Sequence, residues 1–268
     1  MRCALLGLLI AGAVAGRGLA ADLPAAEPAK VVLPAPAFTW SGTYVGLNFG
    51  DAAGSFNFDP STTNNLTGAV VDSGSTSVSD SAIIGGFQIS HNWQFGSWVI
   101  GLEHNTQFGN LQQTLNVASP AGALLPGDSL SAKVDVLGAT GAKVGWAWDR
   151  VLLYATGGLE TGLVNASANY IARPGGSPAQ TFSDNDKIQT GYTVGAGLDY
   201  AITDRLNVGV EYRYVDLGSQ TFNLGAVTGS ASAGASTVNT NVVLHASEVT
   251  ARLNFKLGDT YHFRWLNW

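Results

Sequence analysis

The chain has 268 residues, of which 12% are charged and 34 are glycine. This charged share is about half of what a soluble domain usually carries. No segment beyond the N-terminus has the roughly 18 unbroken apolar residues of a membrane helix, which argues against a helical inner-membrane bundle. The formal net charge of −6 argues against a nucleic-acid binder. What remains is a β-rich protein, and one whose outside can face lipid.

Residues 1–20 have the features of a secretory signal peptide. Arg2 supplies the positive start, residues 4–16 form an apolar run, and residues 18–20 fit a small-x-small cleavage site. Cleavage would remove Cys3, which excludes disulfides, thiol nucleophiles and cysteine metal sites from the mature chain. It would also take 2 of the 13 basic residues, leaving 11 against 19 acidic ones and a net charge of −8. Residues 21–39, with prolines among alanines, are predicted to be a linker.

Period-2 alternation of apolar residues predicts an all-β fold over residues 40–257, with eight antiparallel strands. The strands are placed at 42–54, 80–93, 97–108, 131–147, 151–163, 187–202, 205–217 and 246–257. Short turns near residues 95, 149 and 203 alternate with long loops at 55–79, 109–130, 164–186 and 218–245. This asymmetry is typical of a transmembrane β-barrel. The five prolines after the linker all fall in the predicted long loops, since proline cannot donate to a β-ladder.

Charged residues gather on one face of the predicted strands, opposite the apolar face. They number six acids and five bases: Glu103, Lys133, Asp135, Lys143, Glu160, Asp199, Glu211, Arg213, Glu248, Arg252 and Lys256. Charges that are few and balanced favour a paired network inside a barrel over a solvated coat. The apolar face would then meet lipid. An eight-stranded barrel is just wide enough for side chains to fill, so pairs such as Glu211 or Glu248 with Arg213 or Arg252 are expected to block it.

Aromatic residues cluster beside the short turns, which resembles the girdle at a membrane interface. The girdle residues are Trp93, Phe95, Trp98, Trp146, Trp148 and Tyr200. Alternation by itself leaves another fold open, because a soluble sandwich or lipocalin-like barrel also alternates. In that fold the same aromatics would belong to an ordinary core, and the charged face would meet water.

Several segments resemble the small outer-membrane immunogenic proteins of alphaproteobacteria. The resembling segments are residues 21–24, Phe38 to Asn48 with its W-x-G-x-Y-V-G pattern, residues 85–88, residues 154–158 and residues 210–214. The resemblance covers nearly the whole mature chain. It implies an eight-stranded barrel of the OmpA type in the cell outer membrane, with a structural or surface-exposed role. Some members of the family are described as porin-like, adhesive or haem-binding, so the resemblance does not fix one activity.

The chain departs from the family at its C-terminal end. Family members usually end at the last strand with a terminal aromatic, and residues 254–257 look like that end. Here the chain continues through a tail at 258–268 and finishes on Trp268. The tail is either a periplasmic appendage or the new position of the insertion signal.

The search for catalytic, metal and cofactor sites finds none. The four histidines form no metal-spaced cluster. His245 and Ser247 share the lipid-facing side of the last strand, as in some lipid-modifying barrels, but Glu248 points the other way and cannot orient the histidine. The sequence therefore favours a structural role for His245 and Ser247, at the start of a strand, over a catalytic one.

The sequence predicts an outer-membrane barrel with a structural and surface-exposed role. Its partners would be outer-membrane lipid, periplasmic chaperones and the barrel-insertion machinery, and its long loops are candidates for adhesive, antigenic, host or small-ligand contact. Two alternatives stay open, a small gated channel and, less favoured, a lipid-modifying enzyme.

Overall fold

The computed structural model describes residues 38–72, 74–174, 176–228 and 235–258. The predicted signal peptide, the linker up to residue 37 and the tail from residue 259 lie outside the described residues. No helix in these described ranges is long and apolar enough to cross a membrane.

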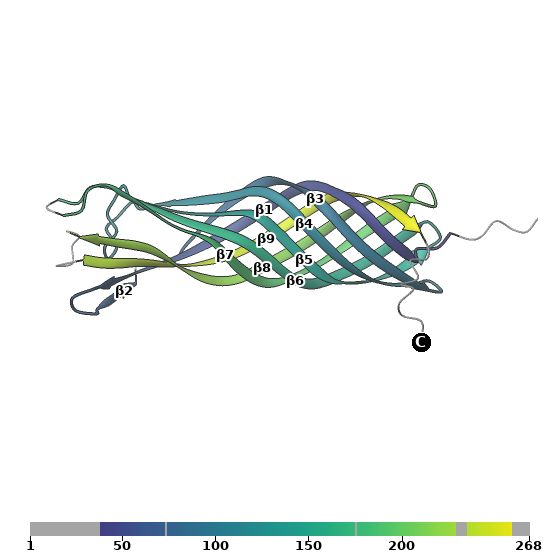
Figure 1. Cartoon of the computed structure of the whole chain (residues 1–268), viewed down its shortest axis with the longest axis horizontal. Coiled ribbons are helices and arrows are strands. Elements are labelled where there is room, and N and C mark those ends of the chain that lie inside the picture. The colour runs from purple at the N-terminus through teal and green to yellow at the C-terminus, as the bar shows by residue number, and fades with distance from the viewer. Residues whose placement is uncertain (1–37, 73, 175, 229–234, 259–268) are drawn as a thin grey trace, which may run out of the picture. The chain divides into compact units, whose positions relative to one another are not determined.

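Eight long antiparallel strands form a closed ring (Figure 1). They are β1 (Gly42–Asn64), β3 (Thr76–Phe95), β4 (Trp98–Asn116), β5 (Ser129–Trp148), β6 (Val151–Tyr170), β7 (Gln180–Ala201), β8 (Leu206–Thr228) and β9 (Ala235–Gly258). Each long strand pairs with the next along the chain, and β1 pairs with β9 to close the ring. A short ninth strand, β2 (Val70–Asp72), pairs only with the end of β1. The predicted antiparallel barrel is confirmed, with β2 as a small addition.

We call the end of the barrel with the short turns the turn end, and the opposite end the loop end. At the loop end the strands continue well beyond their predicted ends. Much of the predicted long loops is strand, for example residues 55–64 in β1 and 218–228 in β8. The prediction was wrong there because the apolar residues of the alternating pattern face inward at the loop end, whereas they face outward nearer the short turns. Along β1, Leu47 and Phe49 face outward, whereas farther along Phe56 and Phe58 face inward.

At the loop end the ring divides into two sheets. The β3–β4 ladder stops at Ile84 and Gly109, and the β7–β8 ladder stops at Tyr192 and Asp216. Beyond these points β8, β9, β1 and β3 form one sheet, and β4, β5, β6 and β7 form the other. The strands diverge accordingly at the end of the barrel that carries β2 (Figure 1).

A large apolar cluster, the loop-end core, lies between the two sheets. Phe56 and Phe222 contribute from the first sheet, and Leu130 and Val164 contribute from the second; all four are fully buried. This end of the molecule therefore has the ordinary polarity of a sandwich in water, with an apolar interior and a polar outside. The part nearer the short turns has the opposite polarity.

Pro60 lies in β1 rather than in a loop, which corrects the proline prediction at this position. It pairs with Thr240 of β9 on one side. On the other side, the β3 ladder ends at Phe58 and the β2 ladder begins at Ser61. Proline has no backbone N–H to donate, and it is tolerated at position 60 because neither β3 nor β2 pairs with this residue on that second side.

Two adjacent glycines in β3 offer a test of how closely the wall is packed. A Cβ on Gly86 would contact the backbone of β4, with Thr106 O and Gln107 Cα (2.8 Å) nearest, whereas a Cβ on Gly85 would have only ordinary contacts at 3.5 Å. We expect Gly86→Ala to lower the free energy of unfolding by about 1–3 kcal/mol, because the backbone must move. Gly85→Ala should change it by under about 1 kcal/mol.

The measurement is urea unfolding of refolded protein in detergent, followed by tryptophan fluorescence and by the mobility shift on heating. Equal effects of the two substitutions would contradict the close approach of Gly86 to the β4 backbone.

Candidate functional site

The interior nearer the short turns contains a charge network built on Glu103 of β4. Its carboxylate accepts from Arg252 Nη2 at 2.6 Å and lies 2.8 Å from Lys143 Nζ. Arg213 Nη2 is 3.9 Å away. All four side chains are buried, and they come from four different strands because inward positions alternate along each strand. Two bases at hydrogen-bonding distance compensate for removing the carboxylate from water.

Glu211 of β8 is the second acid at the centre of the network. It accepts from Arg213 Nη2 at 2.6 Å and from the Tyr154 hydroxyl at 2.8 Å, and it forms a short ion pair with Arg252. Arg252 thus connects Glu103 and Glu211 across the interior. Arg252 and Glu211 side chains are 1% and 2% exposed, so water does not separate the charges.

Three further buried acids have no ion-pair partner within the described part of the chain: Glu160, Asp199 and Glu248. Glu248 therefore does not form the pairing considered for it, whereas Glu211 pairs with both arginines. Nearer the short turns, the described interior has five acids, Glu103, Glu160, Asp199, Glu211 and Glu248, against four bases, Lys143, Arg213, Arg252 and Lys256. Interior charge is nearly balanced, although the pairs are unevenly distributed.

Lys133 and Asp135 lie on the outer surface, which differs from their predicted place inside. They pair with each other at 2.6 Å, and their side chains are 38% and 40% exposed. The cause is a break in the β5–β6 register between Val134 and Val136. A bulge of this kind shifts the alternation by one residue, so Val134 points inward and its charged neighbours point outward.

Trp40 closes the interior at the turn end. It is 1% exposed and belongs to a small cluster with Val99 and Leu152. Its indole N–H donates to Asp149 O at 3.0 Å, and the Tyr44 hydroxyl donates to Trp40 O. Lys256 Nζ donates to Thr39 O at 2.8 Å. The W-x-G-x-Y part of the opening motif therefore begins β1 and also closes the interior at the turn end, as a layer that we call the Trp40 floor.

The six aromatic residues predicted as a girdle lie on the outer surface near the short turns. Trp98 and Trp146 pack edge to face at 5.0 Å, and Trp148 follows at 6.4 Å from Trp146. Trp93, Phe95 and Tyr200 are also exposed, at 41%, 64% and 48%. Their role at a membrane interface stays a prediction.

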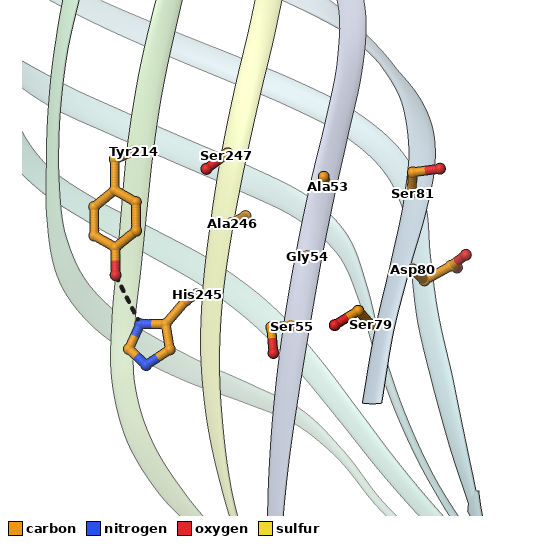
Figure 2. A pocket seen from close by; sticks show the side chains of 10 residues that line it. All are labelled: Ala53, Gly54, Ser55, Ser79, Asp80, Ser81, Tyr214, His245, Ala246 and Ser247. Carbon is orange, nitrogen blue, oxygen red and sulfur yellow. Dashed lines mark hydrogen bonds between the residues drawn. The ribbon is translucent and has the colours of Figure 1, made fainter. Parts of the chain in front are cut away.

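A groove of about 580 Å³ lies on the outer surface across β8, β9, β1 and β3 (Figure 2). His245 Nδ1 shares a hydrogen bond with the Tyr214 hydroxyl at 3.2 Å and lies 3.5 Å from Asp216 Oδ2. Ser247 bonds to Tyr212 instead, and no hydrogen bond joins it to His245 among the described residues. Glu248 is buried on the opposite face. The arrangement lacks the nucleophile–base contact that acyl-transfer chemistry needs.

No group of three or more histidine, cysteine or acidic residues in the described ranges could hold a metal ion.

A buried ion pair at the loop end was missed by sequence reasoning. Arg173 donates to both oxygens of Asp128, at 2.9 and 2.6 Å, and both side chains are fully buried. Asp128 also accepts from the backbone N–H of Leu125 and Ile171, so it connects two loops. Burial, and then the nearby Asp128 charge, raise the pKa of Tyr170. Both charges lie in segments that carry no periodic signal, which is why only their long-range contact reveals them.

Removing Arg252 tests how much the network contributes to stability. We expect Arg252→Met to lower the free energy of unfolding by about 3–5 kcal/mol, because Glu103 and Glu211 would lose their shared cation. Adding Glu103→Gln and Glu211→Gln to Arg252→Met should restore part of the loss, which urea unfolding in detergent would measure.

The matched control is Arg150→Met at a short turn, where Asp204 is 79% exposed. This substitution should cost under about 1 kcal/mol. A similar cost for Arg150→Met and Arg252→Met would argue that the interior charges act as solvated ones.

Comparison with known proteins identifies the family. A family model described as an outer membrane protein beta-barrel domain matches residues 19–255. The 31 kDa outer-membrane immunogenic protein of Brucella melitensis is 33% identical over 213 residues, covering 79% of this chain and 85% of that protein. The 22 kDa outer membrane protein of Rhizobium leguminosarum is 29% identical over 134 residues, covering 50% of this chain and 52% of that protein.

Among solved structures, outer membrane protein OprG from Pseudomonas aeruginosa aligns with a TM-score of 0.45 and 11% identity, covering 81% of this chain and 97% of that one. The family model and the Brucella relative confirm the resemblance and the location inferred from the sequence. The chain therefore belongs to the alphaproteobacterial outer-membrane immunogenic proteins, β-barrels of the cell outer membrane.

Proposed function

We propose that this protein is a closed, non-conducting barrel with a structural role, which holds a rigid two-sheet extension at the cell surface. The observation that carries the proposal is the filled interior. Three layers succeed one another along it: the Trp40 floor, the network around Glu103 and Arg252, and the loop-end core. An eight-stranded barrel packed in this way leaves no continuous water path.

The two-sheet extension suits a surface role. Its outer surface is polar, with Ser55, Asn57 and Asp59 following one another along β1. Its interior is packed and its tip is held by the pair of Asp128 and Arg173. A relative named as an outer-membrane immunogenic protein is consistent with a part of the molecule that faces the outside. We infer that the extension and its loops are the antigenic and adhesive part of the molecule.

A small gated channel is the second candidate, and the charge network is the observation in its favour. Rearrangement of Arg252 between Glu103 and Glu211 would be needed to open a path at that level. The loop-end core argues against this candidate, because ions would still meet a dry apolar layer beyond the network.

A lipid-modifying enzyme has less support. His245 and Ser247 share the outer face, but their hydrogen bonds go to tyrosines. The relatives are named as immunogenic proteins rather than as enzymes. A non-enzymatic role is therefore the proposal.

The apolar outer band implies contact with outer-membrane lipid, with residues such as Leu47 and Phe49 more than half exposed. Periplasmic chaperones and the barrel-insertion machinery are the assembly partners that we propose for a barrel of this kind.

Planar-bilayer recording tests the closed barrel. The refolded protein should give no discrete conductance steps, because the network and the loop-end core block the interior in series. A general porin, reconstituted in parallel, shows that insertion would be detected. Steps that disappear or change size in Glu103→Gln would overturn the proposal and favour the channel.

Cysteine labelling of intact cells tests the orientation. The mature chain is expected to contain no cysteine, so single cysteines can be read without background. A membrane-impermeant maleimide should label Asn65→Cys at the loop end in intact cells. Asp204→Cys, in a short turn, should react only after the outer membrane is permeabilised, and the reverse pattern would refute the assignment.

A further inference from the structure

The strand β3 has a free edge at the loop end. Residues 76–83 pair with β1 on one side. On the other side, the ladder to β4 begins only at Ile84. The neighbouring part of β4, from Leu111 onward, pairs with β5. We call residues 76–83 the β3 edge. A strand with one unpaired side presents a row of N–H and C=O groups that an extended peptide can join.

The two seams of the extension differ in how they are closed. Across the β7–β8 seam, Lys187 Nζ donates to Thr221 O at 2.9 Å, Asn223 N donates to Asp184 Oδ2, and Gln189 Nε2 donates to Gly218 O at 2.8 Å. Across the β3–β4 seam, the described hydrogen bonds include one comparable contact, from Gln113 Nε2 to Ser79 O at 3.1 Å. The β3 edge is therefore the more open of the two.

The β3 edge has few of the features that usually protect an edge strand, and Asp80 is its one charged residue. Residues 76–83 contain no proline, no lysine and no arginine. Native edges are commonly protected by such residues or by bulges, and the register between β1 and β3 is unbroken here. The ends of the β7–β8 seam, in contrast, carry Asp184 and Lys187, which pair at 2.7 Å.

The side chains along the β3 edge alternate in a way that defines what an added strand must offer. Val78 and Ala82 pack against the loop-end core, whereas Ser77, Ser79 and Ser81 are exposed. An added strand would therefore place every second side chain against apolar groups and the others in water. It would have to alternate apolar and polar residues.

Asp80 lies between Val78 and Ala82 and adds a charge requirement. It is half-buried, and no ion pair involves it within the described residues. In Figure 2 its side chain extends from β3 on the side away from β1. A lysine or arginine in the incoming strand would complement this carboxylate.

We propose that the β3 edge binds an extended, basic segment of another protein by strand addition in the seam between β3 and β4. The segment alternates apolar and polar residues and carries a lysine or arginine opposite Asp80. Backbone hydrogen bonds to Ser77, Ser79 and Ser81 would provide affinity, and Val78, Asp80 and Ala82 would provide selectivity. The overall charge supports a basic partner, since the mature chain would carry a net charge of −8 with 11 basic and 19 acidic residues.

A second copy of this chain is the less suitable occupant. Antiparallel pairing of two β3 edges around a two-fold axis would bring one Asp80 close to the other. Like charges facing each other across a strand pair are destabilising. A heterologous segment with a cation at that position avoids this repulsion.

This inference goes beyond the structural role and does not depend on whether the barrel conducts. Loss of peptide binding would leave the bilayer result unchanged, so failure of one proposal can be told from failure of the other.

The test uses a fluorescent eight-residue peptide that alternates valine and threonine, with one central valine replaced by lysine. Its binding to the full mature protein in lipid nanodiscs is followed by fluorescence anisotropy. Ser79→Pro should weaken binding by about tenfold or more, because it removes an edge-facing N–H. Ser79 O bonds toward β4, so the substitution leaves the bonds to β1 in place. Ser79→Ala is the matched control and should bind like the wild type.

The charge requirement has its own reciprocal test. Asp80→Lys should reject the lysine peptide and accept a peptide with glutamate in its place. Hydrogen exchange should show protection of residues 76–83 when the peptide is added, and none of residues 217–228. Unchanged binding in Ser79→Pro, equal binding of a shuffled peptide, or self-association of the protein in place of peptide binding would overturn the proposal. Heat-dependent gel mobility of each variant confirms that the barrel is folded.

Discussion

The wall of this barrel is one strand thick, and every residue must therefore face either the surroundings or the interior. Where the surroundings are lipid, the outward positions are apolar, and the polar residues of each strand lie at the inward positions. Glu103, Glu211, Arg213 and Arg252 are consequently buried together, and they are stable only because each has a partner of opposite charge. The charge network thus follows from the apolar outer surface, because an outer surface in contact with lipid leaves only the interior for charged side chains.

The same constraint explains why the molecule changes character along its length. Beyond the lipid the outward positions can be polar, and the inward positions are then free to form an apolar core. A closed ring is no longer required, because water can satisfy an edge that lipid could not. The β3–β4 and β7–β8 ladders end where this freedom begins, near Ile84 and Asp216. The two open seams therefore begin where the closed ring of ladders ends.

Alternation in the sequence was sufficient to predict the strands, the short turns and the inward face of β8, because one rule holds along the whole lipid-facing part. It failed at the loop end, where Phe56 and Phe58 follow the opposite rule and serine and asparagine suggest loops. It failed again at the β5 bulge, which sends Lys133 and Asp135 outward. Register shifts and contacts such as Asp128 with Arg173 depend on distant strands, and local sequence carries no sign of them.

The position of the seams connects stability with surface chemistry. The lipid-facing ring is closed by ladders all round, so it fixes the near end of the extension. This support allows one seam to remain weakly bonded. The β7–β8 seam is closed by lysine, aspartate and glutamine side chains, whereas the β3 edge keeps Asp80 without an ion pair in the described residues. A basic strand added at this edge would pair with the Asp80 carboxylate and with the open backbone groups at the same time.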